Sequence, residues 1–238
     1  MPIVKLARRT WWYLADSRSP SVTGGVGVIV TDEGSVVVDA GNSPRHARRV
    51  QSSMAEAGLP PATHVVYTHH HWDHTWGACA WPDVEIIGHE TGRDLLRAEA
   101  EIPWSNEYLT QRMAEDSSLR PGYRARARVM ENDWDEFTVV PPQRVFTDRL
   151  TLPGGVEVRH VGGQHAPDST IVVASRSKVV FLGDCFYPPP HHLRTPDDAP
   201  DMGMVGDLLE EGYKWYVDSH SPPHRRWRAK RMVARAAK

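Results

Sequence analysis

The sequence is poor in cysteine, with only Cys79 and Cys185 among its 238 residues. Two thiols cannot build the disulfide framework of a small secreted domain, and they cannot form a zinc site made of cysteine alone. Such sparse cysteine use is typical of proteins in a reducing compartment. We therefore expect a cytoplasmic protein.

Long apolar runs and an excess charge of one sign are also lacking. No stretch approaches the roughly 18 apolar residues that span a bilayer, and the first residues lack the apolar core of a secretory signal. The 28 lysine and arginine residues nearly balance the 30 aspartate and glutamate residues. This balance gives no general attraction to nucleic acid or to an anionic membrane, so we expect neither as a partner.

The remaining composition is that of a globular protein, with 40% apolar and 24% charged residues. The length suits one domain, and we expect a single domain over residues 1–238. Residues 101–144 interrupt its pattern because they are rich in charge and hold few β-branched runs. We expect a helical insertion there, acting as a lid, as a cover for the sheet or as the surface of a possible homodimer.

Strands are predicted wherever β-branched residues cluster between turn signals. The predicted strands are a hairpin within 26–40 and single strands at 64–68, 84–87, 145–147, 156–161, 170–174, 178–182 and 215–217. Helices are expected from the Ser43-Pro44 capping pair to about Ala57, near 91–100, near 207–214 and in the basic tail from Arg225. Many strands with interspersed helices predict packed sheets covered by helices.

Histidine is the unusual residue, because four of the 13 histidines fall between His69 and His74. The stretch THHHWDHTWG holds the pattern H-x-H-x-D-H, made by His69, His71, Asp73 and His74. Positions two apart in an extended segment point to the same side, so His69 and His71 can converge on one point. Asp73 and His74 follow as the chain turns and can address a second, adjacent point. His70 and Trp72 alternate with these residues and should point away.

Three further donors each follow a predicted strand. His165 lies in VGGQHAPDS, Asp184 in FLGDC and His220 in YVDSHSPP. Residues at strand ends are held by a rigid frame while their loops stay free to vary. Seven candidate ligands from four strand ends predict a dinuclear metal site, in which imidazole and carboxylate donors suit two zinc ions, with iron or manganese possible.

In order and spacing, these motifs resemble those of the metallo-β-lactamase-fold hydrolase superfamily, from Asp39 in VVVDAG to His220. The resemblance implies an α+β fold, an αββα sandwich of two mixed β-sheets packed face to face with helices outside. It implies that Asp184 bridges two metals and that Asp39 supports the motif loop. By the same resemblance, one metal is held by His69, His71 and His165, and the other by Asp73, His74 and His220.

Two departures from the family pattern narrow the expectation. The bridging position is Asp184, where true metallo-β-lactamases usually have cysteine or serine, which argues against a dedicated β-lactamase. The last motif reads SHSPP rather than a glycine-flanked histidine. His71 argues against the branch that resembles flavodiiron proteins, which has glutamate at that position.

The expected function is a metal-dependent hydrolase of a small organic substrate. A hydroxide bound between the two metals would attack an ester, thioester, lactone or amide carbonyl, with Asp73 as the catalytic residue that orients the hydroxide and moves its proton. Two alternatives stay open. One is a sulfur-compound dioxygenase with a single iron, and the other is a metal-binding protein without turnover.

Candidate substrate-binding residues come from two places. Trp72 and Trp104 are aromatic residues that could wall the pocket. Tyr187, His191 and His192 lie just beyond Asp184, in a proline-rich loop that could overhang the metals. Nothing in the sequence selects one substrate from the many that this fold serves.

Overall fold

The computed structural model describes residues 3–16, 22–190 and 193–236. Among these residues, the first sheet has seven strands, and its neighbours β4 to β7 run parallel. The order across this sheet is β1 (Ile3–Ala7), β2 (Thr10–Tyr13), β3 (Val26–Val30), β4 (Ser35–Val38), β5 (Ala62–Val66), β6 (Glu85–His89) and β7 (Arg144–Phe146).

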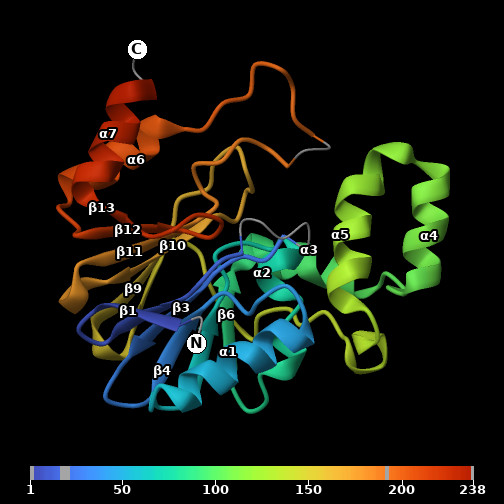
Figure 1. Ribbon diagram of the computed structural model, residues 1–238, viewed down its shortest axis with the longest axis horizontal. Coiled ribbons are helices and arrows are strands. Elements are labelled where there is room, and N and C mark those ends of the chain that lie inside the picture. Colours follow the sequence, from blue (N-terminus) through green and yellow to red (C-terminus); the bar gives the residue numbers. More distant parts are fainter. Residues whose placement is uncertain (1–2, 17–21, 191–192, 237–238) are drawn as a thin grey trace.

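The second sheet has six strands within the described ranges and combines parallel and antiparallel pairs. Its order is β13 (His224–Arg225), β12 (Trp215–Asp218), β11 (Val179–Gly183), β10 (Thr170–Ala174), β9 (Val156–His160) and β8 (Arg149–Leu152). Figure 1 shows the two sheets stacked at the centre of the molecule. The chain crosses from one sheet to the other between β7 and β8.

Helices cover the outer faces of both sheets. In Figure 1, α6 and α7 lie beyond the second sheet and α1 lies beyond the first, which gives the four layers of an αββα sandwich. The helices are α1 (Pro44–Glu56), the short α2 (Trp72–Thr75), α3 (Glu90–Ala100), α4 (Asn106–Glu115), α5 (Arg120–Met130), α6 (Met202–Glu210) and α7 (Arg226–Ala236). The α+β sandwich predicted from the sequence is confirmed.

The alternation of side chains along single strands explains why the sheets bury both faces. In β11, Phe181 packs between the sheets, whereas Val180 and Leu182 pack against the helices of the second sheet. In β4, Val36 faces the second sheet and Val37 faces the α1 side. These strands therefore read as continuous apolar runs, which is typical of strands buried on both faces.

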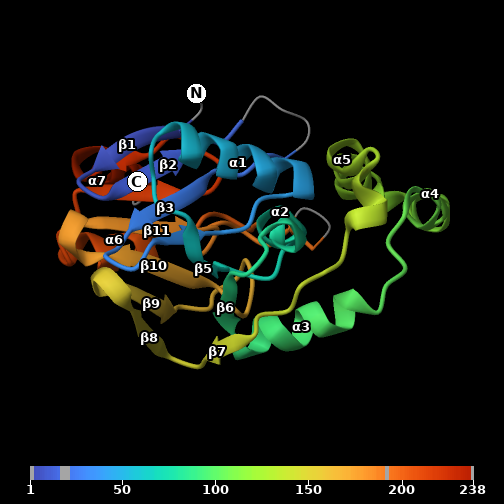
Figure 2. The ribbon, with the colours of Figure 1, turned by 90° about the horizontal axis from the view of Figure 1, so that it is seen from below.

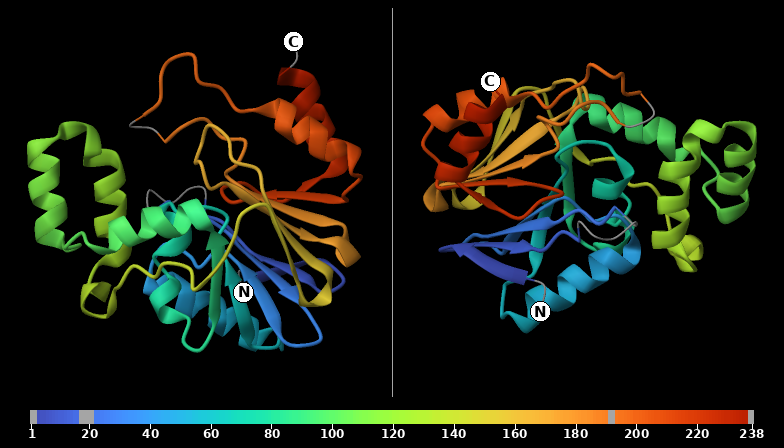
Figure 3. Two further views of the ribbon diagram at one scale, coloured as in Figure 1. Left: turned by 180° about the vertical axis from the view of Figure 1, so that it is seen from behind. Right: turned by 45° about the horizontal axis from the view of Figure 1, so that its top comes forward.

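Residues 101–144 contain α4 and α5, which form a hairpin that stands out from the sandwich (Figures 2 and 3). An aromatic cluster ties this hairpin to α2: Trp76 contacts Trp104 at 4.9 Å and Phe137 at 4.7 Å between ring centroids. Met130 and Val129 of α5 are buried in the same cluster. The aromatic side chains of this segment thus hold the hairpin against the loop that contains residues 69–74.

Several elements differ from the sequence prediction. β1, β2, β8 and β13 were not predicted, because their runs of two to five residues give a weak signal before pairing. β1 pairs with β2, β2 with β3, β8 with β9 and β13 with β12. The helix expected near 207–214 begins earlier, at Met202, because Asp201 accepts a hydrogen bond from the backbone amide of Met204. Ser43 caps α1 as predicted.

No helix in residues 3–16, 22–190 or 193–236 has the length and apolar character that crossing a membrane requires.

Candidate metal centre

The direction of the strands brings the predicted donors to one edge of the sandwich. β10 is antiparallel to both β9 and β11, and β11 is parallel to β12, so β9, β11 and β12 all run the same way. His165, Asp184 and His220 follow the carboxyl ends of these three strands. Residues 69–74 follow β5 of the other sheet, and the backbone amide of Thr170 donates to the carbonyl of Thr68 (2.8 Å), joining the two sheets there.

The motif loop changes conformation halfway, and this separates its donors into two sets. His69 lies in a bend and His71 in extended backbone, and Nε2 of His69 is 2.8 Å from Nδ1 of His71. His71 then precedes α2, whose first turn presents Asp73 and His74. A bend that ends in the extended His71 and is followed by a helical turn therefore aims four side chains of one loop at two neighbouring points.

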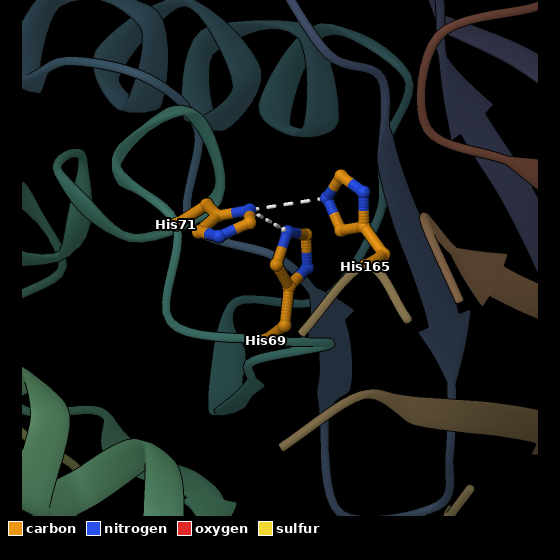
Figure 4. Close-up of side chains that lie close together, drawn as sticks. All are labelled: His69, His71 and His165. Atoms are coloured by element: carbon orange, nitrogen blue, oxygen red, sulfur yellow. Dashed lines mark hydrogen bonds between the residues drawn. The ribbon is translucent and has the colours of Figure 1, made fainter. Parts of the chain in front are cut away.

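The first set is completed by His165, whose Nε2 lies 3.0 Å from Nδ1 of His71 (Figure 4). The Nδ1–H of His165 donates to the carbonyl of Pro188 at 2.9 Å, which leaves the lone pair of Nε2 facing the other two rings. Ligand atoms of a tetrahedral zinc site lie about 3.3 Å apart, given bonds of about 2.0–2.1 Å. The three imidazoles thus have the spacing of one metal site.

The second set consists of Asp73, His74 and His220. Oδ2 of Asp73 lies 3.4 Å from Nε2 of His74 and 3.3 Å from Nε2 of His220. Asp184 stands between the sets, because its Oδ2 lies 3.5 Å from Nε2 of His165 and 3.1 Å from Nε2 of His220. One carboxylate therefore adjoins both sets, as a bridging ligand would.

Two buried atoms of the site lack any hydrogen-bond partner in the described structure: Nε2 of His74 and Oδ1 of Asp184. A buried polar atom without a partner is costly, and metal coordination is one way to satisfy it. Three imidazole nitrogens facing each other also cannot all be satisfied by one shared proton. The donor set therefore fits a metal ion better than it fits a hydrogen-bond network.

Burial and mutual charge make the two sets electrostatically different. Burial, reinforced by the neighbouring histidines, lowers the pKa of His69 and of His71 well below the usual range. Neutral imidazole is the form that binds a metal. Burial opposes the charge on His220 as well, but Asp184 and Asp73 outweigh it and raise its pKa to about 10. Carboxylate charge is thus concentrated around the second set.

Asp39 orients the loop through hydrogen bonds to Thr68 and His74. Its Oδ1 accepts a hydrogen bond from the amide of Thr68 (2.8 Å), and its Oδ2 accepts from the Thr68 hydroxyl (3.0 Å) and from Nδ1 of His74 (2.8 Å). Because that hydroxyl donates to Asp39, it accepts from Nδ1 of His69, at 3.2 Å. Both histidines then present Nε2 to the centre, which is how outer hydrogen bonds commonly orient metal ligands.

Gly183 allows the two sheets to meet at this point. It has φ +55°, and a Cβ there would lie 2.6 Å from Cβ of Thr68. A side chain at this position would push Thr68 away from Asp39 or displace Asp184, the next residue. The glycine therefore sets the distance between the loop after β5 and the loop after β11.

Two supporting carboxylates were missed from the sequence. Oδ1 of Asp168 lies 2.8 Å from Nδ1 of His70, which keeps His70 turned away from the metal-ligand sets, as predicted from its alternation. Oδ1 of Asp218 accepts from the backbone amides of His220 (3.0 Å) and Ser221 (2.8 Å), which shapes the last loop. An aspartate at the end of the strand, two residues before His220, is the signal that could have found Asp218.

The candidate substrate residues lie in different surroundings. Trp72 is buried in the aromatic cluster, and Trp104 packs partly buried against it. The hydroxyl of Tyr187 donates to Oδ1 of Asp218 at 2.7 Å, with its ring 6.1 Å from that of His220. His191 and His192 lie outside the described residues. Contact of any of these residues with substrate stays a prediction.

Comparison with known proteins places this geometry in a family. The profile of the metallo-beta-lactamase superfamily matches residues 24–231. Comparison with curated proteins finds no match.

Solved structures share the fold. A metallo beta lactamase from Hirschia baltica has a TM-score of 0.64 and 18% identity, over 98% of this chain and 95% of that one. A metallo-beta-lactamase from Pontibacter korlensis has a TM-score of 0.63 and 19% identity, over 98% and 96%. The mono-zinc form of FIM-1 from Pseudomonas aeruginosa has a TM-score of 0.64 and 14% identity, over 100% and 97%. At these identities the likeness is one of fold.

Proposed function

The chain belongs to the metallo-beta-lactamase superfamily, and on that premise we propose that it is a hydrolase of a small organic substrate that works with two zinc ions. The observation that carries the proposal is the pair of adjoining donor sets with Asp184 between them. A single metal would leave either His71 or His220 without a role. The donors favour zinc because five of the seven are imidazoles and the other two are carboxylates.

When bound, two zinc ions would supply a Lewis acid for the carbonyl oxygen and would lower the pKa of a water so that it attacks at neutral pH. The protein's own residues do the rest. Burial alone would raise the pKa of Asp73, but His74 and His220 hold it well below the usual range, so its carboxylate is ionised. An ionised carboxylate in this place accepts a hydrogen bond from the nucleophilic water and orients it.

The bond broken is that of an ester, a thioester, a lactone or an amide. The similar structures are described as metallo-beta-lactamases, which suggests an amide bond in a strained ring as one member of this range. Asp184 argues against a dedicated β-lactamase, because a carboxylate stands where those enzymes usually have a thiol or hydroxyl. Unstrained ester, thioester and lactone bonds are therefore the substrates to test first.

The test combines metal analysis with hydrolysis assays. Purified protein loaded with zinc should hold about two ions per chain and should hydrolyse at least one member of a panel of esters, thioesters, lactones and β-lactams. His71→Ala should lose turnover and about one of the two ions, because His71 belongs to the first set only. His64→Ala is the matched control, because His64 lies in β5 outside the donor sets and pairs with Thr63.

Two results would replace this proposal with an alternative. One iron per chain together with oxygen consumption on a sulfur compound would favour the dioxygenase. Metal-loaded protein that is inert on the whole panel would favour a metal-binding protein without turnover.

A further inference from the structure

The α4–α5 hairpin carries a cation into the aromatic cluster beside the metal centre. Arg126 lies on α5, and its guanidinium carbon stands over four aromatic rings. The distances to the ring centroids are 4.9 Å for Trp72, 5.1 Å for Tyr123, 5.4 Å for Trp76 and 5.6 Å for Trp104. Rings on several sides hold the guanidinium in one place, since a cation is attracted to each ring face.

Within the described residues, this guanidinium has no hydrogen bond and no ion pair, and its Nε is buried without a partner. Glu99 is the obvious counter-ion, but its Oε1 accepts from Nε1 of Trp76 (2.7 Å) and lies beyond ion-pair distance from Arg126. Arg126 as a whole is partly exposed, although its Nε is buried among the rings. A charged fork with unused donors therefore remains open to a ligand.

The position of Arg126 relative to the metal ligands is set by α2. Trp72, which the guanidinium covers, lies between His71 and Asp73 in the chain. The charge of Asp73 also acts on Arg126: burial lowers the pKa of Arg126, while Glu99, Tyr123 and Asp73 oppose that shift. The guanidinium thus contacts Trp72, which lies within the loop that supplies four of the seven donors.

We propose that Arg126 binds a carboxylate of the substrate and so restricts the hydrolase to small anionic substrates, an inference that rests on the proposed function. Guanidinium is planar and matches a carboxylate with two parallel hydrogen bonds. The four surrounding rings restrict the position of the guanidinium before binding, so less conformational entropy is lost when the carboxylate arrives. A carboxylate would also satisfy the donors that the folded protein leaves unpaired.

A purely structural role predicts a different behaviour. If Arg126 only packed the hairpin against the tryptophans, any side chain of similar length and shape would serve, and no anion would be recognised. Methionine keeps the length and removes the charge, and lysine keeps the charge and removes the planar fork. These two substitutions therefore separate packing from recognition.

The first test measures binding without turnover. Isothermal titration calorimetry compares succinate with its uncharged analogue succinamide on metal-free protein, so that zinc cannot bind the carboxylate itself. Succinate should bind, and Arg126→Met should weaken it by about 10- to 100-fold, the usual worth of hydrogen bonds to a charged group. Arg124→Met is the matched control, because Arg124 lies exposed on the same helix.

The second test uses the zinc-loaded enzyme and two esters that differ only in charge: 4-nitrophenyl hydrogen succinate and 4-nitrophenyl 4-amino-4-oxobutanoate. The wild-type enzyme should have a lower KM for the ester that carries a free carboxylate than for the ester that carries an amide. Arg126→Met should remove this difference and leave the KM for the amide-bearing ester nearly unchanged. Arg126→Lys should retain part of the difference. Thermal melting of each variant shows whether the hairpin stays folded.

The outcomes separate the two proposals. If esters are hydrolysed with no charge preference, or if Arg126→Lys and Arg126→Met bind succinate as the folded wild type does, Arg126 is structural and the inference is wrong. If succinate binds through Arg126 but no panel substrate is hydrolysed, the proposed function fails while the carboxylate site stands.

Discussion

Oδ2 of Asp39 lies 2.8 Å from Nδ1 of His74, and this contact determines which nitrogen of His74 faces the other donors. Both side chains are almost fully buried, at 4% and 1% exposure. Nδ1–H of His74 donates to this carboxylate, so Nε2 faces Asp73 and Asp184. A residue outside both donor sets thereby orients one of the candidate ligands.

Replacement of Asp39 should therefore weaken metal binding without removing a donor. Asp39→Asn keeps the shape but takes away the charge that holds the His74 proton, and loss of such supporting contacts costs about 10- to 100-fold in metal affinity. Competition with a zinc-binding dye measures it. Asp32→Asn, at an exposed ion pair with Arg9, serves as the control and should bind zinc like the wild type. Equal affinity of Asp39→Asn and wild type would contradict this role.

The two donor sets should separate by mutation. His220→Ala removes a donor of the second set and leaves His69, His71 and His165 intact. Zinc content, measured by inductively coupled plasma mass spectrometry, should fall from about two ions to about one per chain. His165→Ala should cause the same loss from the other set. Loss of all zinc from both variants would show that the sets are not independent sites.

Substitution by alanine should lower the free energy of unfolding more at Gly183 than at another glycine with a similar positive φ. Gly58 has φ +67° with open space around it, so Gly58→Ala should cost only the backbone strain, about 1 kcal/mol. Gly183→Ala adds a collision with Thr68, and we expect about 3 kcal/mol in total. Urea unfolding of both variants measures the difference. If both variants lost the same free energy of unfolding, the contact between Thr68 and residue 183 would be able to adjust to a side chain.

Buried His46 should make the protein sensitive to mild acid. It lies in α1 with 5% exposure, and burial, with a smaller effect of Arg49, lowers its pKa to about 4. The unfolded chain has a histidine pKa of about 6.5, so it takes up a proton first as the pH falls. The stability that neutral His46 contributes is therefore complete above about pH 6.5 and is lost as the pH falls toward 4.

Comparison of wild type with His46→Gln, both metal-free, isolates this effect, since other groups titrate alike in the two proteins. The advantage of the wild type in the free energy of unfolding should shrink by about 2 to 3 kcal/mol between pH 7.5 and 4.5. Urea unfolding at the two pH values measures it. A constant difference would show that His46 is not the group responsible.

The donors could be found from the sequence because their signals are local. His69 to His74 form one compact motif, and the remaining three donors follow recognisable strands, so the strand prediction also placed the site. The alternation of His69, His70 and His71 correctly separated the inward rings from the outward one, and the contact with Asp168 holds His70 outward.

The supporting contacts could not be found this way, because they join distant segments. His70 and Asp168 are 98 positions apart, and nothing near either residue indicates the other. Arg126 is one of several arginines on a charged helix, and only the packing of α5 against α2 distinguishes it. The edge strands β1 and β8 were not predicted for a related reason. Their sequences are compatible with a strand, but they adopt that conformation only when a neighbouring strand pairs with them.

The division of donors between two sheets has a consequence for the making of the protein. When a ribosome has completed the first sheet up to β6, it has produced His69 to His74 but none of the donors that complete either set. His220 follows β12, after every other donor in the chain. Newly made chains must therefore pass most of translation with incomplete donor sets, and a metal ion would bind at full strength only once both sheets have packed on each other.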